Sequence, residues 1–235
     1  MRIRRSGWVA IAAAIVGAAT WLHPTLVQDV TTAPSYAEPA AVSGDVAALL
    51  QQVRVIDRLP AVDGYDRGCG KGEGCVFGPA WNDPSDRSGC DARNKILASS
   101  LRDVTFKPGT RNCKVTGGVL DPDPYTGQRI PLQDKGIEVD HVVPLARAFA
   151  LGAWQWDPQQ RQIFANDPIE LIPVSKAANR QKSDSGLDEW LPTFQPCAYI
   201  QRYLTVAAKY QLPITAAEHT VATTTCPAAA AAPAA

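Results

Sequence analysis

The sequence has few histidines and no excess of charge of either sign. Its 235 residues contain three histidines, and 23 basic side chains balance 23 acidic ones. A protein that coats nucleic acid usually has a strongly basic composition, so this balance argues against a binding module of that kind. A hydrolase needs only a local positive groove, and the composition leaves that class open.

The sequence also lacks an apolar run of the usual length for a bilayer span. The run Trp8–Leu22 is uncharged but shorter than the about 20 residues that a transmembrane helix needs. Three arginines precede it, and residues 35–37 form a small-x-small cleavage site. We therefore expect residues 1–37 to be a signal peptide and the protein to be secreted or held at the cell surface. The long spacer after the apolar run leaves an uncleaved membrane anchor as the alternative.

No Cys-x-x-Cys pair is present, which argues against a structural zinc site. All six cysteines follow the expected cleavage site, and an even number behind an export signal indicates disulfides. The sequence leaves their connectivity open, and our hypothesis pairs neighbours along the chain. The expected bridges are Cys69–Cys75, Cys90–Cys113 and Cys197–Cys226.

Apolar periodicity and turn residues predict a single α+β domain, stabilised by disulfides and without internal repeats. Residues 60–89, rich in Gly, Asp, Pro and Cys, are expected to be irregular. The expected helices cover 45–59, 91–101, 145–152, 157–165, 176–182, 188–191 and 197–210. The expected strands cover 104–106, 113–120, 136–143 and 169–174. The expected parts of the chain are the signal peptide (1–37), a linker with an N-terminal helix (38–59), the domain (60–226) and a disordered Ala/Pro tail (227–235).

One segment combines residue types that suit phosphodiester hydrolysis. Asp140 and His141 are neighbours at the end of a predicted strand, so their side chains serve opposite faces. Asn179 and Lys182 lie one turn apart on a predicted helix and share a face. Carboxylate and amide oxygens suit a hard divalent cation, for which we expect Mg²⁺, with Mn²⁺ and Ca²⁺ as alternatives. His141 is the candidate base, because the other two histidines lie in the export segment and near the C-terminus.

Many residues around this segment recur, in the same order, in a known family. They are Tyr65, Arg67, Trp81, Gly89, Cys90, Arg93, Asn94, Tyr125, Thr126, Gly127, Val139, Asp140, His141, Pro144, Leu145, Ala146, Gly152, Ala153, Trp154, Phe164, Ala165, Asn166, Asp167, Pro168, Leu171, Asn179, Lys182, Asp184, Trp190, Leu191, Pro192, Cys197 and Tyr199. The set resembles the exported bacterial branch of the HNH, or ββα-metal, nuclease superfamily, and it covers most of residues 60–226.

The resemblance implies a ββα-metal hairpin-helix unit within the domain and a metal-dependent endonuclease with little sequence specificity. Nucleic acid would be the substrate, with DNA favoured over RNA, and no stable protein partner is implied, so we expect a monomer. By the same resemblance, Asp140 and Asn179 would hold one divalent cation and His141 would be the general base.

Two further residues are placed with the catalytic group. Lys182 matches the family pattern, whereas Glu170 departs from it, because the family usually has an asparagine there that orients the histidine. An ionised glutamate can accept a hydrogen bond at this position but cannot donate one. Asn166 or Asp167 could perform the bracing instead.

Positive side chains near the motif are expected to meet phosphate oxygens, with arginine making paired contacts. The candidates are Arg67, Arg93, Arg147, Lys176 and Arg180. Ion pairs with nearby aspartates are the alternative for the first two. Four tryptophans are interpreted as core or groove walls rather than base-stacking platforms: Trp81, Trp154, Trp156 and Trp190.

Two other function classes stay open. Glu170 and an uncleaved anchor would suit a catalytically silent binding module of the cell surface. A cell-wall hydrolase would need a zinc site or paired catalytic carboxylates, and the scarcity of histidine makes the zinc version hard to build. Metal-dependent cleavage of DNA separates the nuclease from both.

Overall fold

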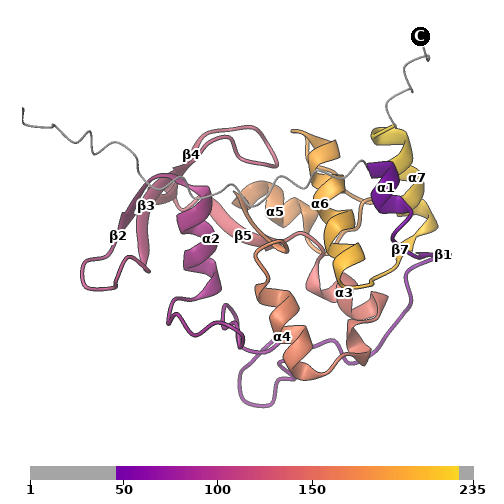
Figure 1. Cartoon of the computed structure of the whole chain (residues 1–235), viewed down its shortest axis with the longest axis horizontal. Helices are drawn as coiled ribbons and strands as arrows, with labels where there is room; N and C mark the ends of the chain where they lie inside the picture. Colours follow the sequence, from indigo (N-terminus) through magenta and orange to yellow (C-terminus); the bar gives the residue numbers. More distant parts are fainter. Residues whose placement is uncertain (1–45, 228–235) are drawn as a thin grey trace, which may run out of the picture. The chain divides into compact units, whose positions relative to one another are not determined.

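Short strands and helices alternate along residues 46–227 of the computed structural model, which are the residues that the structure describes (Figure 1). The helices are α1 (Val46–Leu50), α2 (Ala92–Ser100), α3 (Leu145–Leu151), α4 (Pro158–Asn166), α5 (Lys176–Lys182), α6 (Pro196–Lys209) and α7 (Ala216–Thr225), with 3-10 turns η1 (Leu132–Asp134) and η2 (Ala153–Gln155). The strands are β1 (Val55–Ile56), β2 (Arg102–Phe106), β3 (Val115–Leu120), β4 (Ile130–Pro131), β5 (Ile137–His141), β6 (Leu171–Ser175) and β7 (Ile214–Thr215). The predicted α+β class is confirmed.

The predicted signal peptide, the start of the linker and nearly all of the Ala/Pro tail lie outside the described residues. Between Val46 and Pro227, no helix is long and apolar enough to cross a membrane.

The helices that position the site begin where their capping residues predict. Asp91 accepts a hydrogen bond from the backbone of Asn94 and caps α2, and Asp157 caps α4 with Pro158 in its first turn. Ser175 caps α5. These side chains satisfy backbone N–H groups that the start of a helix leaves unpaired, so the local sequence was sufficient to predict them.

The helix expected over residues 45–59 is wrong beyond Leu50. Residues Val55–Ile56 form β1 instead, which pairs in parallel with β7 near the C-terminus. The backbone N–H of Ile214 donates to the carbonyl of Arg54 at 3.0 Å. A pairing between distant segments therefore overrides the helical spacing of the apolar residues.

A strand–strand–helix unit lies at the centre of the described region. Strands β5 and β6 pair antiparallel, from Ile137 opposite Ser175 to His141 opposite Leu171, although α3, η2 and α4 separate them in sequence. Helix α5 follows β6 directly and packs against both strands. It runs back along the hairpin, so that its last residue, Lys182, contacts the end of β5.

This hairpin lies between two hydrophobic cores. The smaller core joins α2 and β3 to Val139 and Leu171, and the larger core joins Ile172 and Val174 to α3, α4 and α6. Figure 1 shows β5 between the β2–β3–β4 sheet and α6. Asp140 and His141 are therefore both buried although they point to opposite faces of β5; Asp140 is only 9% exposed. Strands covered on both faces are buried on both faces.

The three expected disulfides are confirmed. One closes a short loop ahead of α2, the second links the start of α2 to the β2–β3 connection, and the third joins the start of α6 to the end of α7. They are Cys69–Cys75, Cys90–Cys113 and Cys197–Cys226. Residues 60–89 contain no helix or strand, as predicted. The Cys69–Cys75 bridge lies within this irregular segment, and Cys90–Cys113 ties its end to the β2–β3 connection. Disulfides persist in oxidising compartments, which is consistent with export.

Candidate active site

A cleft of about 370 Å³ lies where β5 ends and α5 passes. The strand contributes Asp140 and His141 to it, and the helix contributes Asn179. The structure thus brings together the three residues on which the predicted site depends, although 38 residues separate the last two. Asp184 and Tyr65 also line the cleft, and the sequence analysis assigned no role to either.

Asp140 is held by three hydrogen bonds. Its Oδ2 accepts from the Tyr125 hydroxyl at 2.7 Å and from Lys182 Nζ at 2.8 Å, and its Oδ1 accepts from the backbone N–H of His141 at 2.8 Å. A carboxylate has about four acceptor positions, so Oδ1 keeps one of them for a further contact. The carboxylate is therefore fixed in orientation and not fully used by the protein.

Asn179 and Lys182 both contact β5, as expected of residues that share a helix face, but Lys182 does not line the cleft. Its side chain is fully buried, and Nζ donates to the backbone carbonyl of His141 at 2.8 Å as well as pairing with Asp140. A buried ammonium group needs such partners, because an unpaired charge away from water is costly. Lys182 thus holds the end of β5 in place and does not reach toward substrate.

The imidazole of His141 is fixed in one neutral form. Its Nε2 lies 2.9 Å from the carbonyl oxygen of Ala165, and since a carbonyl only accepts, Nε2 carries the proton. Nδ1 is then the unprotonated nitrogen. The ring lies nearly parallel to the Trp81 indole, with 6.1 Å between ring centroids and 9° between planes. Burial, and next the charge of Arg67, lower the pKa of His141 to about 3.

The low pKa of His141 predicts how stability depends on pH. In the unfolded chain this histidine has its usual pKa near 6.5, so between pH 6.5 and 3 the unfolded state binds more protons than the folded state. The contribution is fully present above pH 6.5 and is lost as the pH falls through that window, by up to about 1.4 kcal/mol per pH unit. Urea unfolding of His141→Gln should therefore show a shallower acid loss than the wild type.

The matched control for this measurement is His219→Gln, on helix α7, which should keep the steep acid loss of the wild type. Equal slopes for wild type and His141→Gln would show that His141 is protonated normally in the folded protein.

The side-chain amide of Asn179 is also oriented by a protein contact. Its Nδ2 donates to Glu138 Oε2 at 3.0 Å, and Oδ1 receives no hydrogen bond from residues 46–227. The same glutamate lies 3.9 Å from Lys176 Nζ and 3.6 Å from Arg180. Lys176 and Arg180, predicted to bind substrate, therefore surround Glu138 and do not line the cleft at His141.

The donor set of the cleft fits a divalent cation that keeps several water ligands. Asp140 Oδ1 and Asn179 Oδ1 are oxygen donors, which is the type that Mg²⁺ prefers. Within the described part of the chain, no three His, Cys, Asp or Glu residues are arranged as a metal site. The cleft thus offers the amide of Asn179 and the carboxylates of Asp140 and Asp184, and water would complete the coordination.

Glu170 braces the segment that follows His141. Its side chain is fully buried, Oε2 accepts from the backbone N–H of Val143 at 3.2 Å, and its carbonyl accepts from Val142 at 2.8 Å. Burial raises the pKa of Glu170 well above its usual value. Burial thus favours the protonated form of the side chain, which has a hydrogen-bond donor that the ionised form lacks. Asn166 and Asp167 make other contacts, to residues outside this segment.

Glu170→Gln should leave the free energy of unfolding within about 1 kcal/mol of the wild type, because a neutral amide has the shape and the hydrogen-bonding groups of a protonated carboxyl. Glu170→Ala is the matched control and should cost about 2 kcal/mol or more, since it opens a cavity and leaves the Val143 N–H unpaired. Chemical denaturation measures both. A glutamine variant as unstable as the alanine variant would mean that the native glutamate is ionised.

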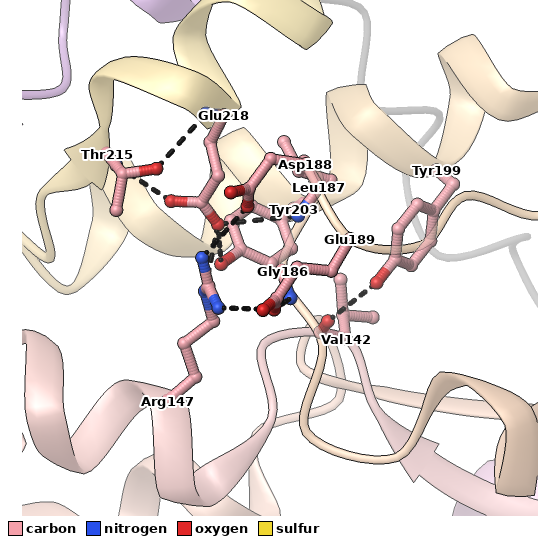
Figure 2. Close-up of polar contacts among 10 residues, drawn as sticks. All are labelled: Val142, Arg147, Gly186, Leu187, Asp188, Glu189, Tyr199, Tyr203, Thr215 and Glu218. Carbon is pink, nitrogen blue, oxygen red and sulfur yellow. Dashed lines mark hydrogen bonds and ion pairs between the residues drawn. The ribbon is translucent and has the colours of Figure 1, made fainter. Parts of the chain in front are cut away.

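Arg147 is not available to phosphate, and its predicted role in substrate binding is corrected. The side chain is 4% exposed, and its guanidinium lies 3.0 Å from Glu218, 3.1 Å from Asp188 and 3.0 Å from Glu189 (Figure 2). Residues 188–191, expected to be helical, are a turn and an extended stretch. Two acidic side chains of that turn bind Arg147, so the network joins α3 to α7 and to the chain after α5.

The two remaining candidates for substrate binding differ. Arg67 is exposed and lines the cleft beside His141, as its predicted role requires. Arg93 is half-buried on α2 and does not line the cleft. Tyr125 and Tyr199 match the family pattern, but no role was expected for either; their hydroxyls hold Asp140 and the carbonyl of Val142. The local sequence could not have indicated these roles, because each tyrosine is 15 or more residues from its partner.

Comparison with known proteins adds a family and a relative. Residues 91–221 match the family described as GmrSD restriction endonucleases, C-terminal domain. A fungal protein from Arthroderma benhamiae, described as an uncharacterized secreted protein, is 35% identical over 138 residues, which make up 57% of this chain and 65% of that protein. This chain therefore spans less than two thirds of the length of the fungal protein. No solved structure matches.

Proposed function

Because the chain belongs to the family of C-terminal domains of GmrSD restriction endonucleases, which matches more than half of its residues, we propose that it is a metal-dependent endonuclease. The proposed substrate is DNA, with RNA as the alternative, and the proposed class is the HNH, or ββα-metal, nucleases. The observation that carries the proposal is the meeting of Asp140, His141 and Asn179 in one cleft. The unit formed by β5, β6 and α5 would be the hairpin-helix unit of that class.

His141 would act as the general base through Nδ1. Its other nitrogen is occupied by the Ala165 carbonyl, so Nδ1 can take a proton from a water molecule that attacks phosphorus. The Ala165 carbonyl then faces the imidazolium of His141 and stabilises its positive charge. Arg67 lowers the pKa of this ring, and a phosphate beside Arg67 would offset that effect and strengthen the base.

Asp140 and Asn179 would hold one divalent cation, with Mg²⁺ proposed and Mn²⁺ or Ca²⁺ as alternatives. When bound, the cation would supply positive charge to the phosphate and to the leaving 3′ oxygen. Lys182 and Tyr125 fix the carboxylate of Asp140, and Glu138 fixes the amide of Asn179, so both donors are oriented in advance. Arg67 would bind the phosphate oxygens of the substrate.

We also propose that the protein acts outside the cytoplasm, secreted or attached to the cell surface, as a monomer without a stable protein partner. Three disulfides and a relative described as secreted support export. The relative is fungal, and the bacterial branch named in the sequence analysis rests on the resemblance alone.

A plasmid assay tests the proposed function. Supercoiled DNA incubated with the oxidised protein should be nicked and then degraded in Mg²⁺, and should stay intact with a chelator. Adding back Mg²⁺, Mn²⁺ or Ca²⁺ in turn identifies the cations that restore cleavage. Cleavage that persists in chelator would rule out the metal-dependent mechanism, and intact plasmid in every cation would favour the silent binding module.

A further inference from the structure

A second, smaller cavity adjoins the cleft at His141. Its volume is about 150 Å³, and its apolar wall is formed by Phe77, Pro79 and Trp81. Arg67, His141 and Leu145 line both this cavity and the cleft of the candidate active site. A molecule with a ring joined to a phosphate could therefore place the ring in the small cavity and the phosphate in the cleft.

We propose that this cavity is a subsite for one unpaired pyrimidine base of the nucleic acid whose phosphate lies in the adjoining cleft. This inference rests on the proposed nuclease function and names the substrate feature that the enzyme selects. It would give Trp81, interpreted from the sequence as a core or groove wall, a base-stacking role.

The size of the cavity selects the base. A cavity of about 150 Å³ is the size that holds a single six-membered ring such as benzene, so it suits a pyrimidine better than the two fused rings of a purine. A base can enter only after it leaves the stack of a duplex, which costs least in a single strand. The subsite therefore favours unpaired pyrimidines.

The backbone of Trp81 is held in an unfavourable conformation for so large a residue. Its φ is 63°, in the left-handed region that bulky residues rarely adopt. Two hydrogen bonds hold this backbone conformation in place. The Trp81 carbonyl accepts from the backbone N–H of Ala92 at 3.0 Å, and the Asn82 carbonyl accepts from Gln162 Nε2 at 2.6 Å. Residues kept in such conformations concentrate at binding and catalytic sites, where the strain fixes a side chain in place.

Asn166 gives the cavity an unused hydrogen-bond acceptor. The side chain is 2% exposed, and its Nδ2 donates to the carbonyls of Asn82 at 3.3 Å and Gln162 at 2.8 Å. Its Oδ1 has no partner among residues 46–227. Every pyrimidine base carries an N–H group on its pairing edge, and this group could reach the covered Oδ1 once the Asn166 side chain shifts toward the cavity that it lines. Buried acceptors are rarely left unpaired, which makes this atom a marker for a ligand.

Binding measured without cleavage tests the proposal. Short labelled single strands of thymidine, of deoxycytidine, of deoxyadenosine and of abasic sugar-phosphate are titrated with the wild type in chelator at one salt concentration, and fluorescence anisotropy is read. The pyrimidine strands should bind roughly ten-fold more tightly than the abasic and adenine strands, since stacking on an aromatic side chain contributes about that much. Equal affinities for all four strands would overturn the proposal.

Variants separate Trp81 from the other tryptophans. Trp81→Ala should bind all four strands with the affinity of the abasic strand, and Trp81→Phe should keep part of the preference. Trp154→Ala is the matched control, because Trp154 is 48% exposed and lines neither cavity, and it should keep the full preference. A pyrimidine preference that survives in Trp81→Ala would overturn the assignment.

The proposed function and this inference fail in different ways. Absence of plasmid cleavage in every cation would overturn the nuclease while the anisotropy titrations still decide the subsite. An active nuclease whose four affinities are equal would overturn the subsite alone.

Discussion

Replacing His141 with alanine should slow DNA cleavage by about 10²- to 10⁴-fold, the usual contribution of a general base. The loss should appear in kcat, because the imidazole acts on the attacking water and not on the binding of substrate. The measurement is the initial rate of nicking of supercoiled plasmid in Mg²⁺, at several DNA concentrations.

The fold around this position should survive the substitution. Lys182 and Asp140 contact the backbone carbonyl and N–H of His141, and neither contact depends on the imidazole. His219→Ala is the matched control, since His219 lies on α7 and does not line the cleft. It should cleave at the rate of the wild type. If His141→Ala, correctly folded, retained more than about a tenth of the activity, His141 would not be the base.

Arg147→Met should lower the free energy of unfolding by about 3–5 kcal/mol. The substitution keeps much of the volume but leaves the fully buried Glu218 without its cation. Removing one partner of a buried ion pair is costly because the remaining charge stays away from water. For a domain of this size the melting temperature should fall by roughly 10 °C, which differential scanning calorimetry measures.

A double substitution separates the effect of the unpaired buried charge from the effect of losing the packing of the Arg147 side chain. In Arg147→Met/Glu218→Gln no charge is left unpaired at that position, so part of the lost stability should return. The matched control is Arg180→Met, because that arginine has a side chain 68% exposed in its ion pair with Glu138 and should change stability by less than about 0.5 kcal/mol. A loss as small as this for Arg147→Met would mean that the network contributes little.

Several elements of the fold follow from local sequence. The caps at Asp91, Asp157 and Ser175 place the starts of α2, α4 and α5 correctly, because a cap acts on backbone N–H groups within three residues. Helix α7 was not predicted, although Thr215 and Glu218 form a capping box whose spacing is visible in the sequence. The local sequence therefore does contain a signal for the start of this helix.

Other elements could not follow from local sequence. β1 depends on pairing with β7, roughly 160 residues later in the chain. The sequence predicts Arg147 to be a cation available to substrate near the motif. Only the tertiary contact with α7 brings Glu218 to Arg147, which is buried in the folded protein. The raised pKa of Glu170 is likewise a consequence of burial, which changes the pKa of a side chain without changing its identity.

The order of residues along the chain was enough to indicate an α+β protein with neighbouring disulfides and to select Asp140, His141 and Asn179, since helix caps, cysteine spacing and motif residues act through nearby positions or a matched order. The packing of the chain decided what these residues touch. It buried Lys182 against Asp140 and the His141 carbonyl, and it buried Arg147 against three carboxylates. It also placed the Trp81 ring beside the His141 ring. Desolvation and charge pairing depend on neighbours in space, which the order of residues does not state.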